Sequence, residues 1–351
     1  MAPQNPALLY KKLPSGFPVA GQDVAVDDVQ PVPSEAPQDG LLVQVLYASI
    51  DPYMRGLLRD PDVKSYFPAF KTGEPLKAGV IGKVLESSNS KAQKGALISA
   101  RLFIQRFVTL SAEEVEAATV LDVDPNDKSV DIVQYLGALG MPGLTGYSSF
   151  YEIGKPKKGE TIFISSAAGA VGQVVGQLAK REGLKVIGSV GSDEKLKYLT
   201  EELKFDSGFN YKKEKPQDAL QRLAPNGVDI YFENVGGEHL DAAITNMNSF
   251  GRIIACGMIS EYNAKNEDEK YGHKNLMLIV GKQITMRGFL VFEDPDCGPK
   301  HMNDHQMNVR QWLKDGSMIA KVHEWDISEG DKGFVGMLKG ENFGKAVLKV
   351  S

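Results

Sequence analysis

Hydrophobic and polar positions follow two different patterns along the chain. In the first third, apolar β-branched runs at 41–49 and 79–85 and an alternating stretch at 96–110 are separated by Pro and Gly clusters. Such runs are typical of strands, and such clusters are typical of turns. The polar and aromatic run 51–59 falls between two of the predicted strands. This part of the chain is therefore predicted to be rich in β structure.

From about position 131, short apolar runs alternate with stretches of helical spacing. This alternation indicates βαβ units around a parallel sheet. We therefore expect an α/β fold with a doubly wound parallel sheet next to the β-rich part. The predicted strands are 160–165, 185–190, 228–232, 252–256, 284–291 and 345–350, and the predicted helices are 171–181, 193–203, 239–247 and 309–313.

The composition narrows the class of protein. The 351 residues are 42% hydrophobic and 24% charged, as in ordinary globular proteins, and the net charge of −5 argues against a nucleic-acid-binding surface. Two cysteines are too few for a disulfide framework and suggest a reducing compartment. The uncharged stretches 132–151 and 161–179 contain Gly, Ser and Gln, which favours buried structure over membrane spans. Because residues 1–13 also lack an apolar signal segment, we expect a cytoplasmic protein that binds no membrane.

The positions of histidine and cysteine argue against a metal centre. All five histidines lie at or after His239, and the cysteines are Cys256 and Cys297. Residues 1–238 therefore cannot form an ordinary zinc site, which needs clustered Cys, His or carboxylate ligands. His301 and His305 would share one face of a helix, but the start of a solvated helix explains their spacing better. The sequence predicts no metal site.

A dinucleotide fingerprint follows the predicted strand 160–165. The run 167–172 reads Ala-Ala-Gly-Ala-Val-Gly, with Ala in place of the first glycine. Gly169 would let the backbone approach a pyrophosphate, and Gly172 would let the next helix pack close to the strand. The N-terminus of that helix would offer N–H groups to the anion. The sequence therefore predicts a dinucleotide site on a Rossmann-type sheet.

The second strand of this unit favours NADP over NAD. NAD sites place an acid near the end of that strand to hold the ribose hydroxyls, whereas 185–190 leads into Gly191-Ser192. Lys195 follows at the start of the next helix, where a cation suits a 2′-phosphate. Its neighbours Asp193 and Glu194 leave an ordinary surface lysine as the alternative.

Eight motifs occur in order and carry a resemblance to a known family. They are Gly140–Tyr147, Ala167–Gly172, Val190–Lys195, Phe209–Lys212, Glu233–Gly237, Phe250–Ile253, Cys256–Asn263 and Leu338–Lys345. Together they resemble the zinc-independent medium-chain dehydrogenase/reductases, in particular the prostaglandin reductase and NADPH-dependent alkenal double-bond reductase branch. The resemblance covers the chain from about Asp51 onward.

The resemblance implies a domain arrangement, a cofactor and its contacts. A GroES-like domain would comprise 1–130 and be completed by 312–351, and a Rossmann domain would comprise 131–311 and bind NADP(H). The pyrophosphate would lie at Gly169, Ala170, Val171 and Gly172, and the 2′-phosphate at Lys195 and Tyr211. The rest of the cofactor would contact Asn234, Cys256, Gly257, Ile259, Tyr262, Phe289, Leu290, Val291 and Asn342.

The implied reaction is the reduction of the activated C=C bond of α,β-unsaturated aldehydes or ketones, with hydride transfer to the β-carbon. A hydrogen-bond donor to the carbonyl oxygen would stabilise the developing charge. Tyr262 is the first candidate and Tyr53 the second, and the α-carbon proton would come from Tyr262 or from water. Allylic alcohol oxidation, quinone reduction and a nucleotide-binding module without turnover remain alternatives. We expect a small-molecule enal or enone substrate and no nucleic acid, and a homodimer is the candidate assembly, although the sequence leaves the oligomeric state open.

Overall fold

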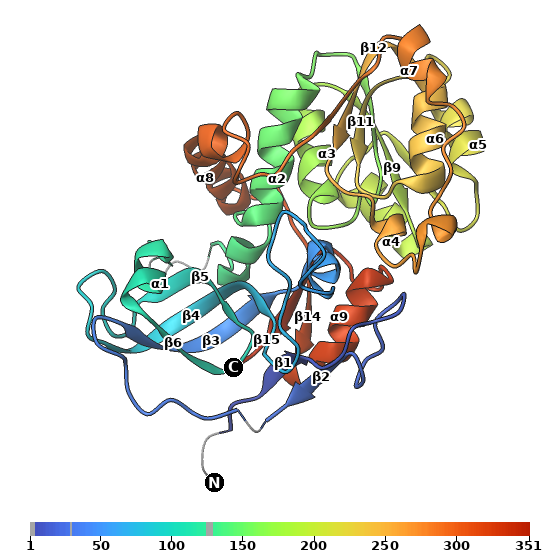
Figure 1. Cartoon of the computed structure of the whole chain (residues 1–351). Helices are drawn as coiled ribbons and strands as arrows, with labels where there is room; N and C mark the ends of the chain where they lie inside the picture. The colour runs from blue at the N-terminus through green and yellow to red at the C-terminus, as the bar shows by residue number, and fades with distance from the viewer. Residues whose placement is uncertain (1–3, 29, 124–128) are drawn as a thin grey trace. The chain divides into compact units, whose positions relative to one another are not determined.

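The computed structural model describes residues 4–28, 30–123 and 129–351, which divide into two compact units (Figure 1). Unit one comprises residues 1–136, 322–342 and 346–351, and unit two comprises 137–321 and 343–345. The sequence-based division at 311/312 falls inside helix α8 (Gly298–Lys314), which belongs entirely to unit two. Each unit is described below by itself.

Unit one consists mainly of a seven-stranded sheet with the order β14-β15-β3-β4-β5-β7, and β6 also pairs with β3. The central pairs β3–β4 and β4–β5 are antiparallel. Alternate residues of β3 and β4 are fully buried and form the core of this unit. The elements are β1 (Ala7–Tyr10), β2 (Val24–Asp27), β3 (Leu41–Ser49), η1 (Pro52–Leu57), β4 (Lys77–Ser87), β5 (Leu97–Phe103), β6 (Phe107–Leu110), α1 (Ala112–Ala117), β7 (Thr119–Val120), η2 (Ile132–Leu136), β14 (Val322–Asp326), α9 (Gly330–Leu338) and most of β15 (Lys345–Lys349).

Unit two contains a six-stranded sheet with the order β10-β9-β8-β11-β12-β13, in which every pair is parallel. In chain order this is the 3-2-1-4-5-6 arrangement of the Rossmann fold. The predicted α/β fold class is therefore confirmed. The strands are β8 (Thr161–Ile164), β9 (Lys185–Val190), β10 (Ser207–Asn210), β11 (Val228–Glu233), β12 (Met247–Ala255) and β13 (Thr285–Gly288).

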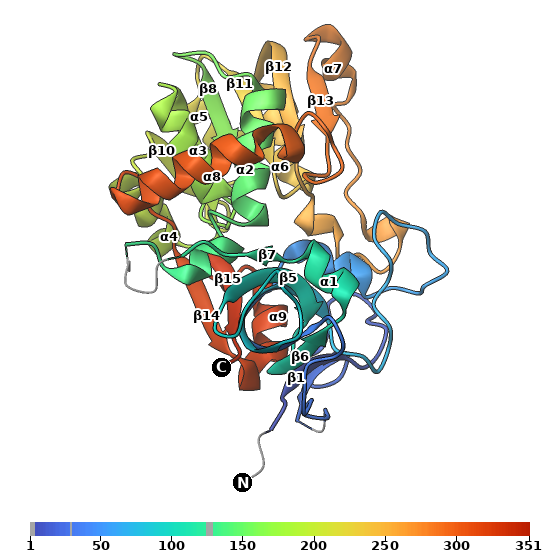
Figure 2. The same ribbon diagram turned by 90° about the vertical axis from the view of Figure 1, so that its left-hand side faces the viewer.

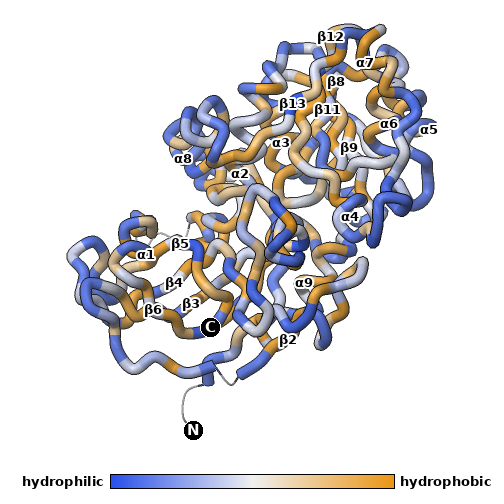
Figure 3. The backbone as a smooth tube through the Cα atoms, in the orientation of Figure 1, coloured by the Kyte–Doolittle hydropathy of each residue, from blue (hydrophilic) through white to orange (hydrophobic). Residues whose placement is uncertain are grey.

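Helices pack on this sheet because its strands are apolar on both faces. Phe163, Ile187, Tyr231 and Ile253 are fully buried, as expected for parallel strands covered by helices. In Figure 3 the strands β8 and β11 are mainly orange and the outer helix α5 is blue, and Figure 2 shows α8 crossing α2, which it contacts. The remaining helices are α2 (Met141–Ser149), α3 (Gly172–Arg181), α4 (Asp193–Lys197), α5 (Pro216–Leu223), α6 (Gly237–Asn246) and α7 (Met277–Gly281).

Several sequence-based elements have other bounds or surroundings in the structure. The strand predicted over 284–291 ends at Gly288, because its neighbour β12 ends at Ala255, the partner of Gly288. The helix predicted over 193–203 continues past α4 as a π-helix, Tyr198–Glu202. The helix start before Val309 is mostly solvated, as expected, but His305 is an exception: it is fully buried on α8, with Nε2 2.9 Å from the carbonyl oxygen of Ala138.

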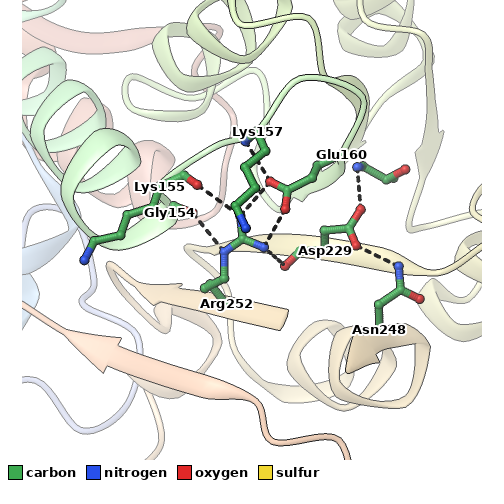
Figure 4. Close-up of polar contacts among 8 residues, drawn as sticks. Gly154, Lys155, Lys157, Glu160, Asp229, Asn248 and Arg252 are labelled. Carbon is green, nitrogen blue, oxygen red and sulfur yellow. Dashed lines mark hydrogen bonds and ion pairs between the residues drawn. The ribbon is translucent and has the colours of Figure 1, made fainter. Parts of the chain in front are cut away.

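A polar network fastens the amino ends of the central strands (Figure 4). Arg252 on β12 forms two hydrogen bonds to Glu160, at 2.9 and 2.6 Å, and donates to the carbonyl oxygen of Gly154 at 3.0 Å. Asp229 on β11 accepts from the backbone N–H of Thr161 and from the amide of Asn248, both at 2.8 Å. The network therefore connects β8, β11 and β12 at the edge where these strands begin.

Among the described residues, no helix combines the length and the apolar character needed to cross a bilayer.

Candidate active site

The loops at the carboxyl ends of β8, β11 and β12 are bonded to one another. The side-chain amide of Asn234 donates to the carbonyl oxygen of Ser165 at 2.8 Å. The N–H of Ile259 donates to the carbonyl oxygen of Asn234 at 3.2 Å, and the N–H of Ser260 donates to that of Val235 at 3.0 Å. Since β8 and β11 are the strands between which the strand order reverses, this edge is the usual ligand position of an open α/β sheet.

The loop between β8 and α3 fits a pyrophosphate. A Cβ on Gly172 would lie 2.6 Å from the carbonyl oxygen of Ser166, so only glycine lets α3 begin this close to the strand. The turn is closed by a 2.9 Å hydrogen bond from the N–H of Gly169 to the same oxygen. Ala170 and Val171 then lead into α3, whose N-terminus carries a partial positive charge, while the N–H groups of Gln173 and Val174 donate to the carbonyl oxygens of Gly169 and Val171, both at 3.1 Å. Such a turn is suited to an anion.

Two lysines and a tyrosine gather where β9 and β10 end. The ring of Tyr211 lies over Gly191, since a Cβ there would come within 3.0 Å of the tyrosine hydroxyl. Burial, and then the positive charge of Lys212, lower the pKa of the Lys195 amine, while Glu194 opposes this shift. Because an anion placed beside both cations would relieve their repulsion, the arrangement fits the 2′-phosphate of NADP.

The carboxylate of Asp193, two residues before Lys195, is already engaged elsewhere. The carboxylate of Asp193 accepts a 2.9 Å hydrogen bond from the Asn210 amide and pairs with Lys213. These bonds, more than the surrounding charge, lower the pKa of Asp193. Asp193 thus holds β10 to α4, and the strand end offers Gly191 and Ser192 in place of the acid typical of NAD sites.

Glu233 organises the turn after β11, although the sequence reasoning did not select it. Its side chain is fully buried, and Oε1 accepts hydrogen bonds from the Tyr231 hydroxyl and from the N–H groups of Val235 and Gly236, at 2.6–2.8 Å. Burial raises the pKa of Glu233, and these donors oppose the shift. The available signal was an acid at a strand end, directly before the Asn-Val-Gly-Gly run that turns into α6.

Tyr262 lies over the end of β12. A Cβ on Gly257 would be 2.9 Å from the Tyr262 hydroxyl oxygen, so glycine is what allows the phenol to occupy this place. The N–H groups of Cys256 and Gly257 both donate to the carbonyl oxygen of Glu233 at 3.0 Å, which joins this loop to the turn after β11. Burial raises the pKa of the Cys256 thiol to about 12, so it carries no charge at neutral pH.

The other predicted contacts are distributed over both units. Residues 289–291 follow β13 directly and begin beside Cys256, because Gly288 pairs with Ala255. Tyr53 and Asn342 belong to unit one. The Tyr53 ring centroid lies 6.0 Å from that of Phe67, and burial raises the pKa of its phenol, which is therefore a neutral donor.

The described residues hold no group of three or more His, Cys, Asp or Glu side chains arranged to bind a metal. His301, the other half of the metal-like pair, lies 3.4 Å from Glu152 through Nε2.

Comparison with known families places both parts of the chain among dehydrogenases. Residues 7–118 match the N-terminal domain of an oxidoreductase family, and residues 170–304 match a family described as zinc-binding dehydrogenase.

Curated relatives match over nearly the whole chain. The NADP-dependent oxidoreductase RED1 of Cochliobolus heterostrophus is 49% identical, covering 99% of this chain and 98% of the relative. The NADP(+)-dependent 2-alkenal reductase of Nicotiana tabacum is 40% identical, with the same coverage.

Solved structures agree with these matches. CurA of Vibrio vulnificus in complex with NADPH superposes with a TM-score of 0.88 at 32% identity, covering 99% of each chain. The quinone oxidoreductase of Escherichia coli, at 15% identity and a TM-score of 0.73, shares the fold.

Proposed function

Because the chain belongs to the zinc-independent, NADP-dependent branch of the medium-chain dehydrogenase/reductases, we propose that it reduces the activated C=C bond of α,β-unsaturated aldehydes or ketones. It is an NADP-dependent oxidoreductase, and the proposal concerns its substrate class and site residues. The tobacco relative, named for 2-alkenal reduction, supports this choice of substrate.

The observation that carries the proposal is the phenol of Tyr262 above Gly257, on the loop that joins β12 to the turn after β11. NADPH, when bound, supplies the hydride that this reaction needs at the β-carbon. The protein must then stabilise the negative charge that develops on the carbonyl oxygen. A neutral phenol can donate a hydrogen bond to that oxygen without a metal ion. Tyr53 is a second donor of the same kind on unit one.

The substitution Tyr262→Phe tests the role of the phenol because it keeps the ring and removes the hydroxyl. A donor that acts in the transition state contributes on the order of 3 kcal/mol, or about a hundredfold or more in rate, and water partly substitutes for a missing hydroxyl, so we expect kcat with a 2-alkenal to fall between about tenfold and a hundredfold. NADPH binding, measured separately by fluorescence titration, should stay unchanged.

Tyr271→Phe is the matched control, since Tyr271 lies in the following loop and bonds to Asp241 at 3.0 Å. A wild-type kcat for Tyr262→Phe contradicts the proposed role, and equal losses in kcat and NADPH affinity make Tyr262 a cofactor-binding residue only. Assays with 2-alkenals, enones, allylic alcohols and quinones, with products identified, test the substrate class. Turnover confined to quinones or to alcohol oxidation contradicts it.

We also propose that the protein is a cytoplasmic homodimer joined through the β13 edge of unit two. β13 is the last strand of its sheet, so one side of its backbone is unpaired within the described chain. Large apolar side chains are exposed on and around it: Leu276, Met277, Val280, Met286, Leu290 and Phe292. An open strand edge with apolar neighbours is suited to pairing with a second copy. Both cysteines are free, as expected in the cytoplasm.

Light scattering after size exclusion tests the assembly. The wild type should elute as a dimer at micromolar concentration, and Met277→Asp with Val280→Asp should elute as a monomer, because the charges would be buried in the interface. Val63→Asp, at an exposed apolar position of unit one, should leave the dimer intact. A monomeric wild type contradicts the assembly without affecting the proposed reaction.

A further inference from the structure

His239 occupies an unfavourable position for a histidine. It lies in the first turn of α6, directly after the turn held by Glu233, and its side chain is 6% exposed. Within the described part of the chain, its Nε2 has no hydrogen-bond partner. Burial lowers the pKa of the imidazole to about 4, so the ring is neutral at physiological pH. Since a buried polar atom without a partner costs free energy, an apolar residue would suit this position better for stability alone.

The ring of His239 extends a stack of aromatic side chains. Phe163 lies against Tyr231 at 4.9 Å and 9°, and His239 continues this arrangement, 6.3 Å from Phe163 at 7°. Phe209 contacts the same imidazole at 6.3 Å and 18°. These partners come from β8, β10 and β11, which are rigid elements of the sheet. The orientation of the His239 ring is therefore fixed by the core.

The outer end of this stack is the residue assigned above to the 2′-phosphate. Tyr211 meets His239 edge to face, with centroids 5.4 Å apart and rings at 78°. Tyr211 is 41% exposed and otherwise lies over Gly191, so few contacts fix its ring. An edge-to-face pair needs a flat ring on both sides, and an aliphatic side chain does not provide one.

We propose that His239 is a positioning residue for NADP selectivity, whose ring holds the phenol of Tyr211 over Gly191 and beside Lys195. The inference rests on the proposed role of Tyr211 in binding the 2′-phosphate. A phenol already held in its binding position loses less side-chain entropy when the phosphate arrives. On this account, the unfavourable burial of the imidazole is retained because it supports selectivity for the phosphorylated cofactor.

The variants His239→Leu and His239→Phe separate this role from a structural one. Leucine is similar in volume and removes the partnerless nitrogen, so the melting temperature should be equal to that of the wild type or higher. It also removes the flat ring, so binding of 2′,5′-ADP should weaken by about three- to tenfold, the range of an aromatic pair. Binding of 5′-AMP, which lacks the 2′-phosphate, should not change. Phenylalanine keeps a ring and should retain selectivity.

The experiment is calorimetric titration of the full chain with 2′,5′-ADP and 5′-AMP, combined with a double-mutant cycle. The proteins are the wild type, the two His239 variants, Tyr211→Ala, and Tyr211→Ala combined with His239→Leu. We expect His239→Leu alone to weaken the binding of 2′,5′-ADP. In the Tyr211→Ala protein the same substitution should cause no further loss of binding, because the two residues act through one contact.

Several results would overturn the inference. The inference is contradicted if His239→Leu weakens the binding of both nucleotides equally or leaves 2′,5′-ADP binding unchanged. It is also contradicted if His239→Leu still weakens 2′,5′-ADP binding in the Tyr211→Ala protein. His239→Met is a second non-aromatic variant, and failure of both the Leu and Met proteins to fold assigns the ring to stability instead. If Tyr211→Ala itself leaves 2′,5′-ADP binding unchanged, the proposed role of Tyr211 fails. If it weakens binding while His239→Leu does not, only the present inference fails.

Discussion

The two edges of the parallel sheet in unit two differ in how many of their polar side-chain atoms have hydrogen-bond partners. At the amino edge, Arg252, Glu160 and Asp229 satisfy one another and the surrounding backbone (Figure 4). At the carboxyl edge, Oε2 of Glu233 and Nε2 of His239 are buried without hydrogen-bond partners in the described chain.

Ser189 Oγ, near the carboxyl end of β9, is likewise buried without a hydrogen-bond partner in the described chain. Ser207 Oγ is also buried without a partner, but it lies at the start of β10. Three of these four atoms therefore lie near the carboxyl edge, where the candidate cofactor loops are, and buried polar atoms without partners cost stability. Proteins commonly accept such costs at functional sites. The contrast indicates that substitutions at one edge should change folding and those at the other should change binding.

Removing the Arg252 side chain from the amino edge should have the largest effect on stability. Arg252→Ala leaves the Glu160 carboxylate and several carbonyl groups without their donor, so we expect the free energy of unfolding to fall by about 2–4 kcal/mol. Urea denaturation measures this change. The dissociation constant of NADPH, measured where the variant is fully folded, should equal that of the wild type.

Arg222→Ala is the matched control for this substitution. Arg222 bonds to Glu214 through two donors as Arg252 does to Glu160, but the pair is more exposed. Its removal should cost less than about 1 kcal/mol. If both variants lose the same stability, the amino-edge network has no special structural role.

Lowering the pH should decrease the stability of the folded protein through His239 at the carboxyl edge. The folded-state pKa of His239 is about 4, below the unfolded value of 6.5, so between these values the unfolded chain binds a proton that the folded chain does not. Stability should therefore fall as the pH drops from 6.5 to 4, by on the order of 3 kcal/mol from this residue.

Urea denaturation across this pH range, compared between the wild type and His239→Leu, measures that contribution. The leucine variant should lose less stability with acid. The buried His305, whose pKa is also lowered to about 4, remains in both proteins and contributes equally. Parallel pH profiles for the two proteins would show that burial of His239 does not disfavour its protonation.

Lys195→Ala addresses binding alone at the carboxyl edge. One charge-assisted hydrogen bond contributes roughly 1.5–3 kcal/mol, so the dissociation constant of NADPH should rise about ten- to a hundredfold. That of NADH should stay nearly constant, as should the melting temperature. Lys197→Ala, two residues further on the same helix, is the control and should change neither constant. An unmutated protein that binds both cofactors equally contradicts the assignment.

Strands were predictable from their short apolar runs even where most of their residues are buried, whereas the buried helix α2 was not. The strands 41–49 and 185–190 have the bounds expected from their residues. The helix α2 was missed because Pro142 and every residue from there to Ser149 are buried, which leaves no polar face to reveal the helical period. The start of α8 was missed for the opposite reason, since few of its residues before Val309 are buried.

A candidate site could be inferred from the sequence where a local motif indicates the chemistry. The spacing from Gly169 to Gly172 and the position of Lys195 required only short-range reasoning. Glu233 and His239 act through bonds and ring contacts to Ser165, Phe163 and Tyr211, which lie far away in the sequence. Their roles depend on tertiary contacts that no local spacing encodes.

The hydrogen bond between Gly344 and the loop 166–172, which joins β8 to α3, has a consequence for how the chain folds during its synthesis. The N–H of Gly344 donates to the carbonyl oxygen of Ala168 at 3.0 Å, and Gly344 bridges Gly169. A side chain at Gly344 would collide with the backbone of Lys321, so this approach depends on glycine. During translation, the loop 166–172 leaves the ribosome long before the segment that braces it. The nascent chain therefore passes through a stage in which strands β8 to β13 have left the ribosome but the loop 166–172 still lacks its bond to Gly344.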